Sequence, residues 1–128
     1  MLAAAEAKAT EIGVDMDIAI VDDGMNLLAF ARMDGAKLTS IDVAFGKAYT
    51  AAGARLPTSR YAETAKAGAP AFGINISNSG KFMIVPGGLP IVLPSGETIG
   101  GIGCSSGTGE QDTEVAQAGI DALLTELT

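Results

Sequence analysis

The stretch Ile18-Ala-Ile-Val-Asp-Asp-Gly-Met-Asn-Leu-Leu-Ala-Phe-Ala-Arg32 decides the fold. An apolar run lies on each side of a segment with turn chemistry, so the pattern predicts a β-hairpin. Asp22 and Asp23 also raise the alternative of a carboxylate pair for acid–base work or for a hard metal ion. Beside Gly24 the same two residues are typical of a tight turn, and we favour that interpretation.

The segments outside the hairpin alternate between helical and strand-like patterns. The predicted helices cover Leu2–Ile12, Ser40–Ala54, about Arg60–Ala67, and the residues after a capping box at Thr108–Gln111. The further predicted strands are Phe82–Val85, Leu89–Leu93 and Thr98–Cys104, with short connections typical of antiparallel pairing. The order predicts one α+β domain over residues 1–128, with helices packed on a five-stranded antiparallel sheet.

The composition excludes several classes of protein and site. The 128 residues include 15 acidic and 8 basic side chains, a net charge of −7, which argues against nucleic-acid binding. The absence of histidine excludes His-assisted nucleophiles and His-ligated metals, and the single cysteine excludes an internal disulfide. No run approaches the roughly 18 apolar residues that span a bilayer. We expect a cytoplasmic protein with no membrane partner.

Two features near the last predicted helix have a chemical and a structural interpretation. The glycines between Gly100 and Gly109 could expose backbone N–H groups to an anion, yet they match neither the dinucleotide fingerprint nor the P-loop. A strand whose glycines allow close backbone approach is the favoured interpretation. Cys104 could be an activated thiol at a helix N-terminus, but a buried, inert thiol is the commoner state.

Arg32, Asp34 and Lys47 form the most informative polar set. An arginine and a lysine that converge on one cleft would select a carboxylate or another anion. A desolvated Lys47 could also act as a base. The structural alternative is an ion pair of Arg32 or Lys47 with Asp34.

Six blocks of the sequence together resemble the GlcG/HbpS-type family, which includes the C-terminal domain of PduO-type proteins. They are Ala19–Gly24, Phe30–Ala36, Gly46–Ala52, Leu56–Ser59, Pro86–Ile91, and Ile99–Gly103 running on to Gly109–Asp112. The resemblance covers nearly the whole chain. It implies a profilin-like layer fold and homo-oligomers built from dimers.

The resemblance also implies ligand-binding positions. The matching blocks suggest a small-molecule site that contains Arg32, Asp34, Lys47, Thr50, Gly87, Gly88, Pro90, Glu110 and Asp112, with Lys47, Arg32 and Asp34 as the candidate catalytic residues. Some members of the family bind haem or are linked to corrinoid metabolism. Without histidine, only Thr, Tyr, Met, Lys or Cys104 could ligate haem iron here. A metal site looks absent, because Asp42 and Phe45 occupy the stretch that carries paired acids in some members.

Two functions therefore remain open. We expect an oligomeric binder of a small carboxylate metabolite or of a haem- or corrinoid-type cofactor. The alternative is a small cofactor-independent isomerase, lyase or deaminase of a catabolic pathway, with Arg32 as the anchor for a carboxylate substrate and Lys47 as the acid/base.

Overall fold

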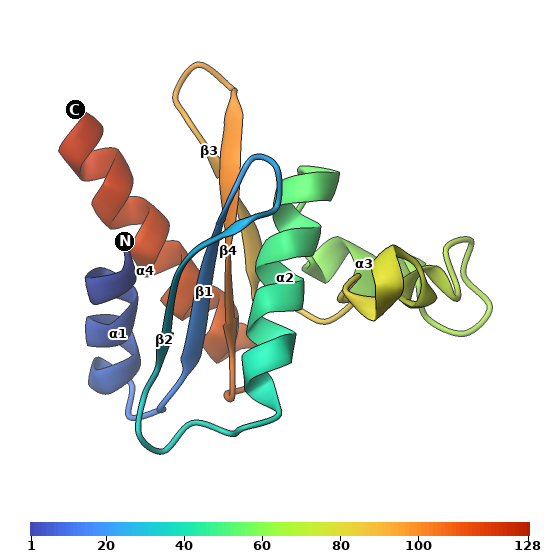
Figure 1. Ribbon diagram of the computed structural model, residues 1–128, viewed down its shortest axis with the longest axis horizontal. Helices are drawn as coiled ribbons and strands as arrows, with labels where there is room; N and C mark the ends of the chain where they lie inside the picture. The colour runs from blue at the N-terminus through green and yellow to red at the C-terminus, as the bar shows by residue number, and fades with distance from the viewer.

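Four strands form one antiparallel sheet in the computed structural model, which describes residues 1–128 (Figure 1). The strands are β1 (Asp17–Asp22), β2 (Leu27–Arg32), β3 (Gly88–Val92) and β4 (Thr98–Ser105), in the spatial order β2-β1-β4-β3. The predicted hairpin is confirmed, because β1 and β2 pair with Ile18 opposite Ala31 and Ile20 opposite Ala29. The strands β2 and β3 are the two edges of the sheet.

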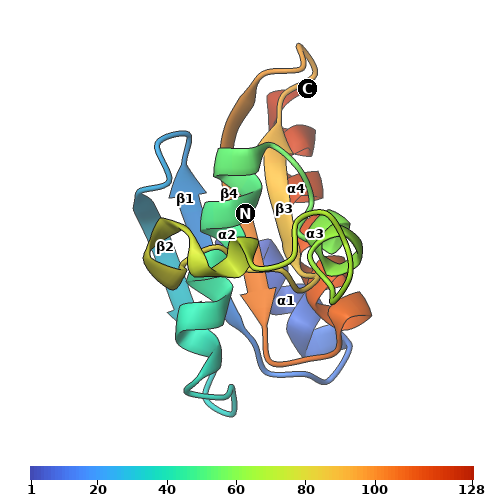
Figure 2. The same cartoon turned by 90° about the vertical axis from the view of Figure 1, so that its right-hand side faces the viewer.

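Helices cover both faces of the sheet. The helices are α1 (Leu2–Glu11), α2 (Ser40–Ala54), α3 (Ser59–Thr64) and α4 (Gly109–Leu127), and two short 3₁₀ turns cover Ile74–Ile76 and Asn78–Gly80. Figures 1 and 2 show α1 and α4 on one face and α2 on the other. The capping box predicted at the start of α4 is present, since Gln111 N–H donates to Thr108 Oγ1 and Thr108 N–H donates to Gln111 Oε1. None of the helices has the length and apolarity needed to cross a membrane.

The expectation of a fifth strand at Phe82–Val85 was wrong. This apolar segment pairs with no strand and runs beside α2 instead. Met83 N–H donates to Thr50 Oγ1 at 2.8 Å, and the Phe82 ring packs edge-on against Tyr61 at 4.8 Å between ring centroids. Side chains of α2 and α3 thus provide the hydrogen-bond and packing partners of this segment, which a period-2 pattern alone would assign to the sheet.

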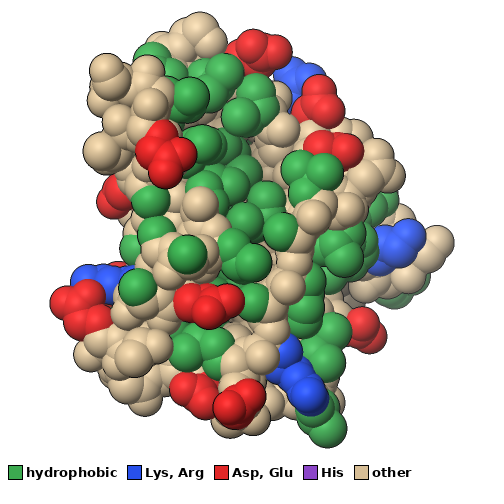
Figure 3. Space-filling view, turned by 60° about the vertical axis from the view of Figure 1, so that its left-hand side comes forward, with side chains coloured by type: hydrophobic (Ala, Val, Ile, Leu, Met, Phe, Trp, Pro, Cys, Tyr) green, Lys and Arg blue, Asp and Glu red, His purple; other side chains and the backbone are tan.

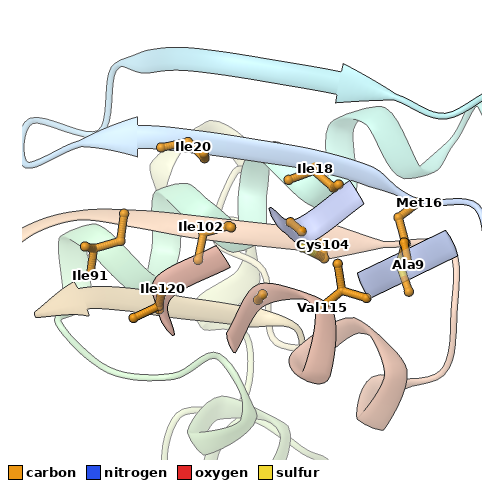
Figure 4. Packing of buried hydrophobic residues seen from close by; sticks show 11 residues of the cluster. Ala9, Met16, Ile18, Ile20, Ile91, Ile102, Cys104, Val115 and Ile120 are labelled. Atoms are coloured by element: carbon orange, nitrogen blue, oxygen red, sulfur yellow. The ribbon is translucent and has the colours of Figure 1, made fainter. Parts of the chain in front are cut away.

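Large aliphatic side chains fill the layer between the sheet and the helices α1 and α4. Because side chains alternate along a strand, Ile18 and Ile20 of β1 and Ile102 and Cys104 of β4 point to this face. Figure 4 shows these side chains meeting Val115 and Ile120 of α4 and Ala9 of α1.

The other layer, under α2, is built from the smallest residues. Ala19 and Val21 of β1 pack against Ala44, Ala48 and Ala52 of α2. Gly101 and Gly103 of β4 face the helix so closely that a Cβ at Gly103 would collide with the Ala44 carbonyl oxygen. The close-approach interpretation of the glycine-rich strand is therefore confirmed.

Candidate functional site

Lys47 and Asp112 form a buried ion pair between α2 and α4. Only 2% of the Lys47 side chain and 4% of the Asp112 side chain are exposed. Lys47 Nζ donates to Asp112 Oδ2 at 2.9 Å and to the Cys104 carbonyl oxygen at 2.8 Å. Asp112 Oδ1 accepts from Gly107 N–H at 2.9 Å. The pair thus joins α2, α4 and the end of β4, and hydrogen bonds compensate both charges.

The predicted glycines enclose this ion pair. A Cβ at Gly87 would lie 2.8 Å from Lys47 Nζ and 2.7 Å from both Asp112 Cβ and the Cys104 carbonyl oxygen. Gly87 also has a φ of 122°, which a residue with a side chain rarely adopts. Gly88 lies against the Lys47 carbonyl and the Thr58 methyl group. These positions leave no space at the ammonium group for a substrate.

Thr50 and Pro90 lie close to the same helix but outside the ion pair. Thr50 is 1% exposed, and its hydroxyl accepts from Met83 N–H and donates to the Lys81 carbonyl oxygen. Pro90 sits in the edge strand β3, opposite Gly101. Thr50 therefore anchors the segment after α3, and Pro90 helps to block further pairing at the sheet edge.

Arg32 and Asp34 make no ion pair with Lys47. Both residues are exposed at the end of the edge strand β2. Lys47 Nζ contacts β4, two strands away, which corresponds to about 10 Å across the sheet. Lys47 pairs with Asp112, and none of its ion-pair contacts involves Asp34.

Asp17 is a buried carboxyl group that sequence reasoning missed. It lies opposite Arg32 of β2 and Ser105 of β4, is fully buried, and neither of its oxygens has a hydrogen-bond partner. Burial raises the pKa of Asp17, although the positive charge of Arg32 opposes that shift. The only sequence signal was its position just before the apolar run that starts at Ile18.

The remaining candidates have structural roles. Asp22 Oδ1 accepts from the backbone N–H groups of Gly24 and Asn26, both at 2.9 Å, which confirms the turn interpretation. The hydrogen bond from Asn26 is the main reason that the pKa of Asp22 is lowered. The Cys104 thiol is buried, and its pKa is raised by burial and by the Asp112 charge. A thiol in that state is inert.

A long groove runs along α4, next to the ion pair. Its volume is about 1100 Å³, and Glu110 is the one predicted site residue that lines it. The other lining residues are Lys8, Ser59, Pro86, Thr108, Gly109, Thr113, Glu114, Gln117, Ala118 and Asp121. Pro86 and Thr108 adjoin Gly87 and Gly107, which contact the ion pair, so the buried pair fixes the two sides of the groove at that end.

The groove is acidic and rich in hydroxyl groups. Three carboxylates line it, at Glu110, Glu114 and Asp121. Lys8 is the one lining cation, and its Nζ already lies 3.3 Å from Glu11 and 3.4 Å from Glu114. Hydrogen bonding and the charge of Glu11, followed by those of Glu114, raise the Lys8 pKa. A second hollow, between α2 and the segment after α3, has a volume of only about 210 Å³ and includes Met25, Tyr49 and Gly53.

A family model described as "Haem degrading protein HbpS-like" matches residues 1–121. The chain belongs to the HbpS-like family. Among its relatives, an uncharacterised 15.0 kDa protein of the dhaT-dhaS intergenic region of Citrobacter freundii is 41% identical to this HbpS-like chain. That alignment covers 96% of the chain and 86% of the relative.

Solved structures of the family agree with this architecture. Klebsiella pneumoniae protein ORFY superposes on the HbpS-like chain with a TM-score of 0.90 at 37% identity, over 94% of this chain and 82% of that one. A PduOC:heme complex superposes with a TM-score of 0.89 at 32% identity, over 94% of this chain and 87% of that one.

The groove also went unnoticed in the sequence of this HbpS-like protein. Its signal is a polar stripe on α4 at the spacing of one helix face, formed by Glu110, Glu114, Gln117 and Asp121. Such a stripe normally indicates only a solvated face. The groove arises because Ser59 and Pro86, distant in sequence, form the facing wall.

Proposed function

We propose that this protein is an oligomeric binder of a haem- or corrinoid-type cofactor, and that the ligand lies in the groove along α4. The volume of the groove, about 1100 Å³, is the observation that carries this proposal. Ligand sites usually have volumes of about 300–1,000 Å³, so this groove is large enough for a tetrapyrrole. The second hollow, at about 210 Å³, is too small for one. The haem complex of a relative with the same fold supports the ligand class.

The groove residues fit a large ring ligand better than a small anion. Thr108 and Thr113 provide hydroxyl groups, and Gln117 provides an amide that can donate and accept hydrogen bonds. A small carboxylate metabolite, the other ligand class predicted from the sequence, would meet Glu110, Glu114 and Asp121 with little compensating positive charge. The same carboxylates suit the amide side chains of a corrinoid, whereas the two propionates of haem would have to extend out of the groove, away from them.

The groove does not offer haem iron the usual axial ligands, which are His, Met, Cys and Tyr side chains. The lining contains no His, Cys, Met or Tyr, so Lys8, Thr108 and Thr113 are the residues that would hold the metal. A bound tetrapyrrole would supply redox or ligand-exchange chemistry at its metal. The chain itself would bind the ring, orient it along α4 and donate hydrogen bonds to its periphery.

The position of Lys47 favours binding over catalysis. The ammonium group is buried and donates to two fixed oxygens, and Gly87 closes the space beside it. A general acid/base has to reach its substrate within hydrogen-bond distance. We assign Lys47 and Asp112 to holding the walls of the groove in place.

The surface supports assembly into homo-oligomers built from dimers. Figure 3 shows a band of apolar side chains running down one face of the molecule. The edge strand β2 exposes 52% of Leu27 and 67% of Leu28. Unpaired, apolar strand edges readily bind a second chain.

A pair of titrations tests the proposal. The purified chain is titrated with haemin and, separately, with diaquacobinamide, and visible absorption reports binding. Ala118→Trp fills the α4 groove, and Ala54→Trp fills the smaller hollow as a matched control. We expect saturable spectral shifts that Ala118→Trp removes and Ala54→Trp retains. No shift with either ligand, or sensitivity to Ala54→Trp alone, would overturn the proposal.

A further inference from the structure

Most of the surface that lines the groove along α4 is apolar, whereas the charged groups that reach it are mainly negative. Pro86 and Ala118 are among the lining residues, and the carbon chains of the polar residues add further apolar surface. A flat, largely apolar ring suits such a surface whatever groups it carries at its edge. The choice between one ring and another therefore depends on those edge groups and on the charges that they meet.

Two of the three lining carboxylates have no compensating charge. Glu110 and Asp121 are both exposed, and neither forms an ion pair. Asp121 Oδ1 accepts a hydrogen bond from Gln117 Nε2 at 2.8 Å, which holds that carboxylate beside another lining residue. Glu110 and Asp121 lie three turns of α4 apart, which corresponds to about 16 Å along the helix. A ring that lies along α4 thus has an acidic side chain near each end.

The positive charges beside the groove are already compensated. Lys8 Nζ lies 3.3 Å from a Glu11 oxygen and 3.4 Å from a Glu114 oxygen, so two carboxylates hold the one lining cation. The positive end of the α4 dipole is met by Glu110 and Asp112 in the first turn of the helix. With three carboxylates and one lysine, the lining has a formal charge of −2. A carboxylate at the edge of a ligand therefore finds no uncompensated cation in the groove.

We propose that the groove selects a cationic, amide-bearing ring of the corrinoid type over haem, and that Glu110 and Asp121 determine this choice. The inference rests on the proposed function and names the class of ring within it. The amide groups at the edge of a corrinoid are neutral and can donate hydrogen bonds to carboxylates. The propionates of haem are themselves carboxylates, so their approach to Glu110 or Asp121 brings like charges together.

Three ring ligands separate the effect of edge charge from the effect of ring type. They are diaquacobinamide, haemin, and a haemin derivative in which both propionates are converted to primary amides. Titrations of the full chain, followed by visible absorption, give the three dissociation constants. We expect cobinamide and the haemin diamide each to bind about tenfold more tightly than haemin, or better. High salt should narrow these differences, because it screens both attraction and repulsion.

Neutral variants of nearly the same shape test the two carboxylates. Glu110→Gln combined with Asp121→Asn removes both charges, so the preference for cobinamide over haemin should fall about fivefold or more. Glu97→Gln combined with Asp23→Asn removes the same two kinds of charge at exposed positions that do not line the groove. This control should keep the full preference. Circular dichroism checks that both double variants are folded.

The outcomes distinguish this inference from the proposed function. Haemin binding as tight as that of cobinamide, a diamide that binds no better than haemin, or a preference that Glu110→Gln with Asp121→Asn leaves intact would overturn the inference alone. Spectral shifts that survive Ala118→Trp would show that the rings bind outside the groove. That result would refute the proposed function and this inference together.

Discussion

Lys47 Nζ lies 2.9 Å from Asp112 Oδ2, and the two residues link the middle of α2 to the first turn of α4 across the end of β4. They are 65 positions apart in the chain. The ion pair fixes the end of the groove at which Pro86 faces Gly109. We call the buried Lys47–Asp112 pair the clamp, because it holds one end of the proposed ligand groove in place.

Removing one partner of the clamp should destabilise the fold strongly. Lys47→Met leaves the Asp112 carboxylate buried and short of its cation, a change that typically costs about 3–5 kcal/mol. Urea denaturation measures the loss as a lower free energy of unfolding. Because Asp112→Leu then removes the uncompensated charge, the double variant should recover part of the loss. A Lys47→Met variant as stable as the unaltered chain would contradict the clamp.

Gly87→Ala should disturb the clamp through packing. The added methyl group would meet Lys47 Nζ, Asp112 Cβ and the Cys104 carbonyl oxygen, and overpacking of this kind costs about 1–3 kcal/mol beyond the strain at a positive φ. Gly96 is the matched control, with a φ of 91° and no neighbouring atom within 4 Å. Thermal denaturation should show a clearly larger loss for Gly87→Ala. Equal losses would mean that only backbone strain matters at Gly87.

Asp17→Asn should stabilise the protein at neutral pH. Burial raises the pKa of Asp17 in the folded state, so the folded chain binds more protons than the unfolded chain. The contribution of Asp17 to stability is therefore present below its unfolded pKa and is lost as the pH rises through its folded pKa. Because asparagine cannot ionise, the loss of stability that comes from ionising Asp17 should be absent from the variant at pH 7.

The measurement for Asp17 is the free energy of unfolding at pH 3 and at pH 7. The advantage of Asp17→Asn should be largest at pH 7 and should shrink toward pH 3. Arg32→Gln offers a matched comparison, because removing the opposing positive charge should increase the loss of stability with pH. A pH profile identical in all three chains would show that Asp17 does not titrate with folding.

Asp22→Ala should have the opposite pH dependence. The hydrogen bonds from Asn26 and Gly24 lower the pKa of Asp22, so its contribution is present above the unfolded pKa. That contribution is lost as the pH falls through the folded pKa, which lies below the ordinary pKa of an aspartate. Chemical denaturation should show a deficit for Asp22→Ala at pH 7 that closes in acid. A deficit independent of pH would assign the effect to turn geometry alone.

Local patterns in the sequence predicted most of the fold, because local chemistry specifies the hairpin, the caps and the helix stripes. The turn at Asp22 and the capping box at Thr108 depend on neighbours within a few residues. Phe82–Val85 shows where this reasoning fails. Its partners are Thr50, which accepts a hydrogen bond from the segment, and Tyr61, which packs against it, rather than a neighbouring strand.

The candidate site was less predictable, because it depends on contacts between distant segments. The family pattern singled out Lys47 and Asp112 separately, but no spacing rule indicates that they pair with each other. The groove escaped prediction for the same reason, since Ser59 and Pro86 meet α4 only in the folded chain. The lack of a hydrogen-bond partner for Asp17 is likewise visible only in the folded sheet, where Asp17 lies between Arg32 of β2 and Ser105 of β4.

The central claim is that the groove along α4 holds the ligand, and paramagnetic broadening of backbone amide resonances tests it most directly. Ferric haem is added in small increments to ¹⁵N-labelled protein, and the loss of each amide signal is followed. The amides of Thr108, Gly109, Thr113 and Gln117 should broaden first. Broadening centred on Met25, Tyr49 and Gly53, or no selective broadening at all, would contradict it.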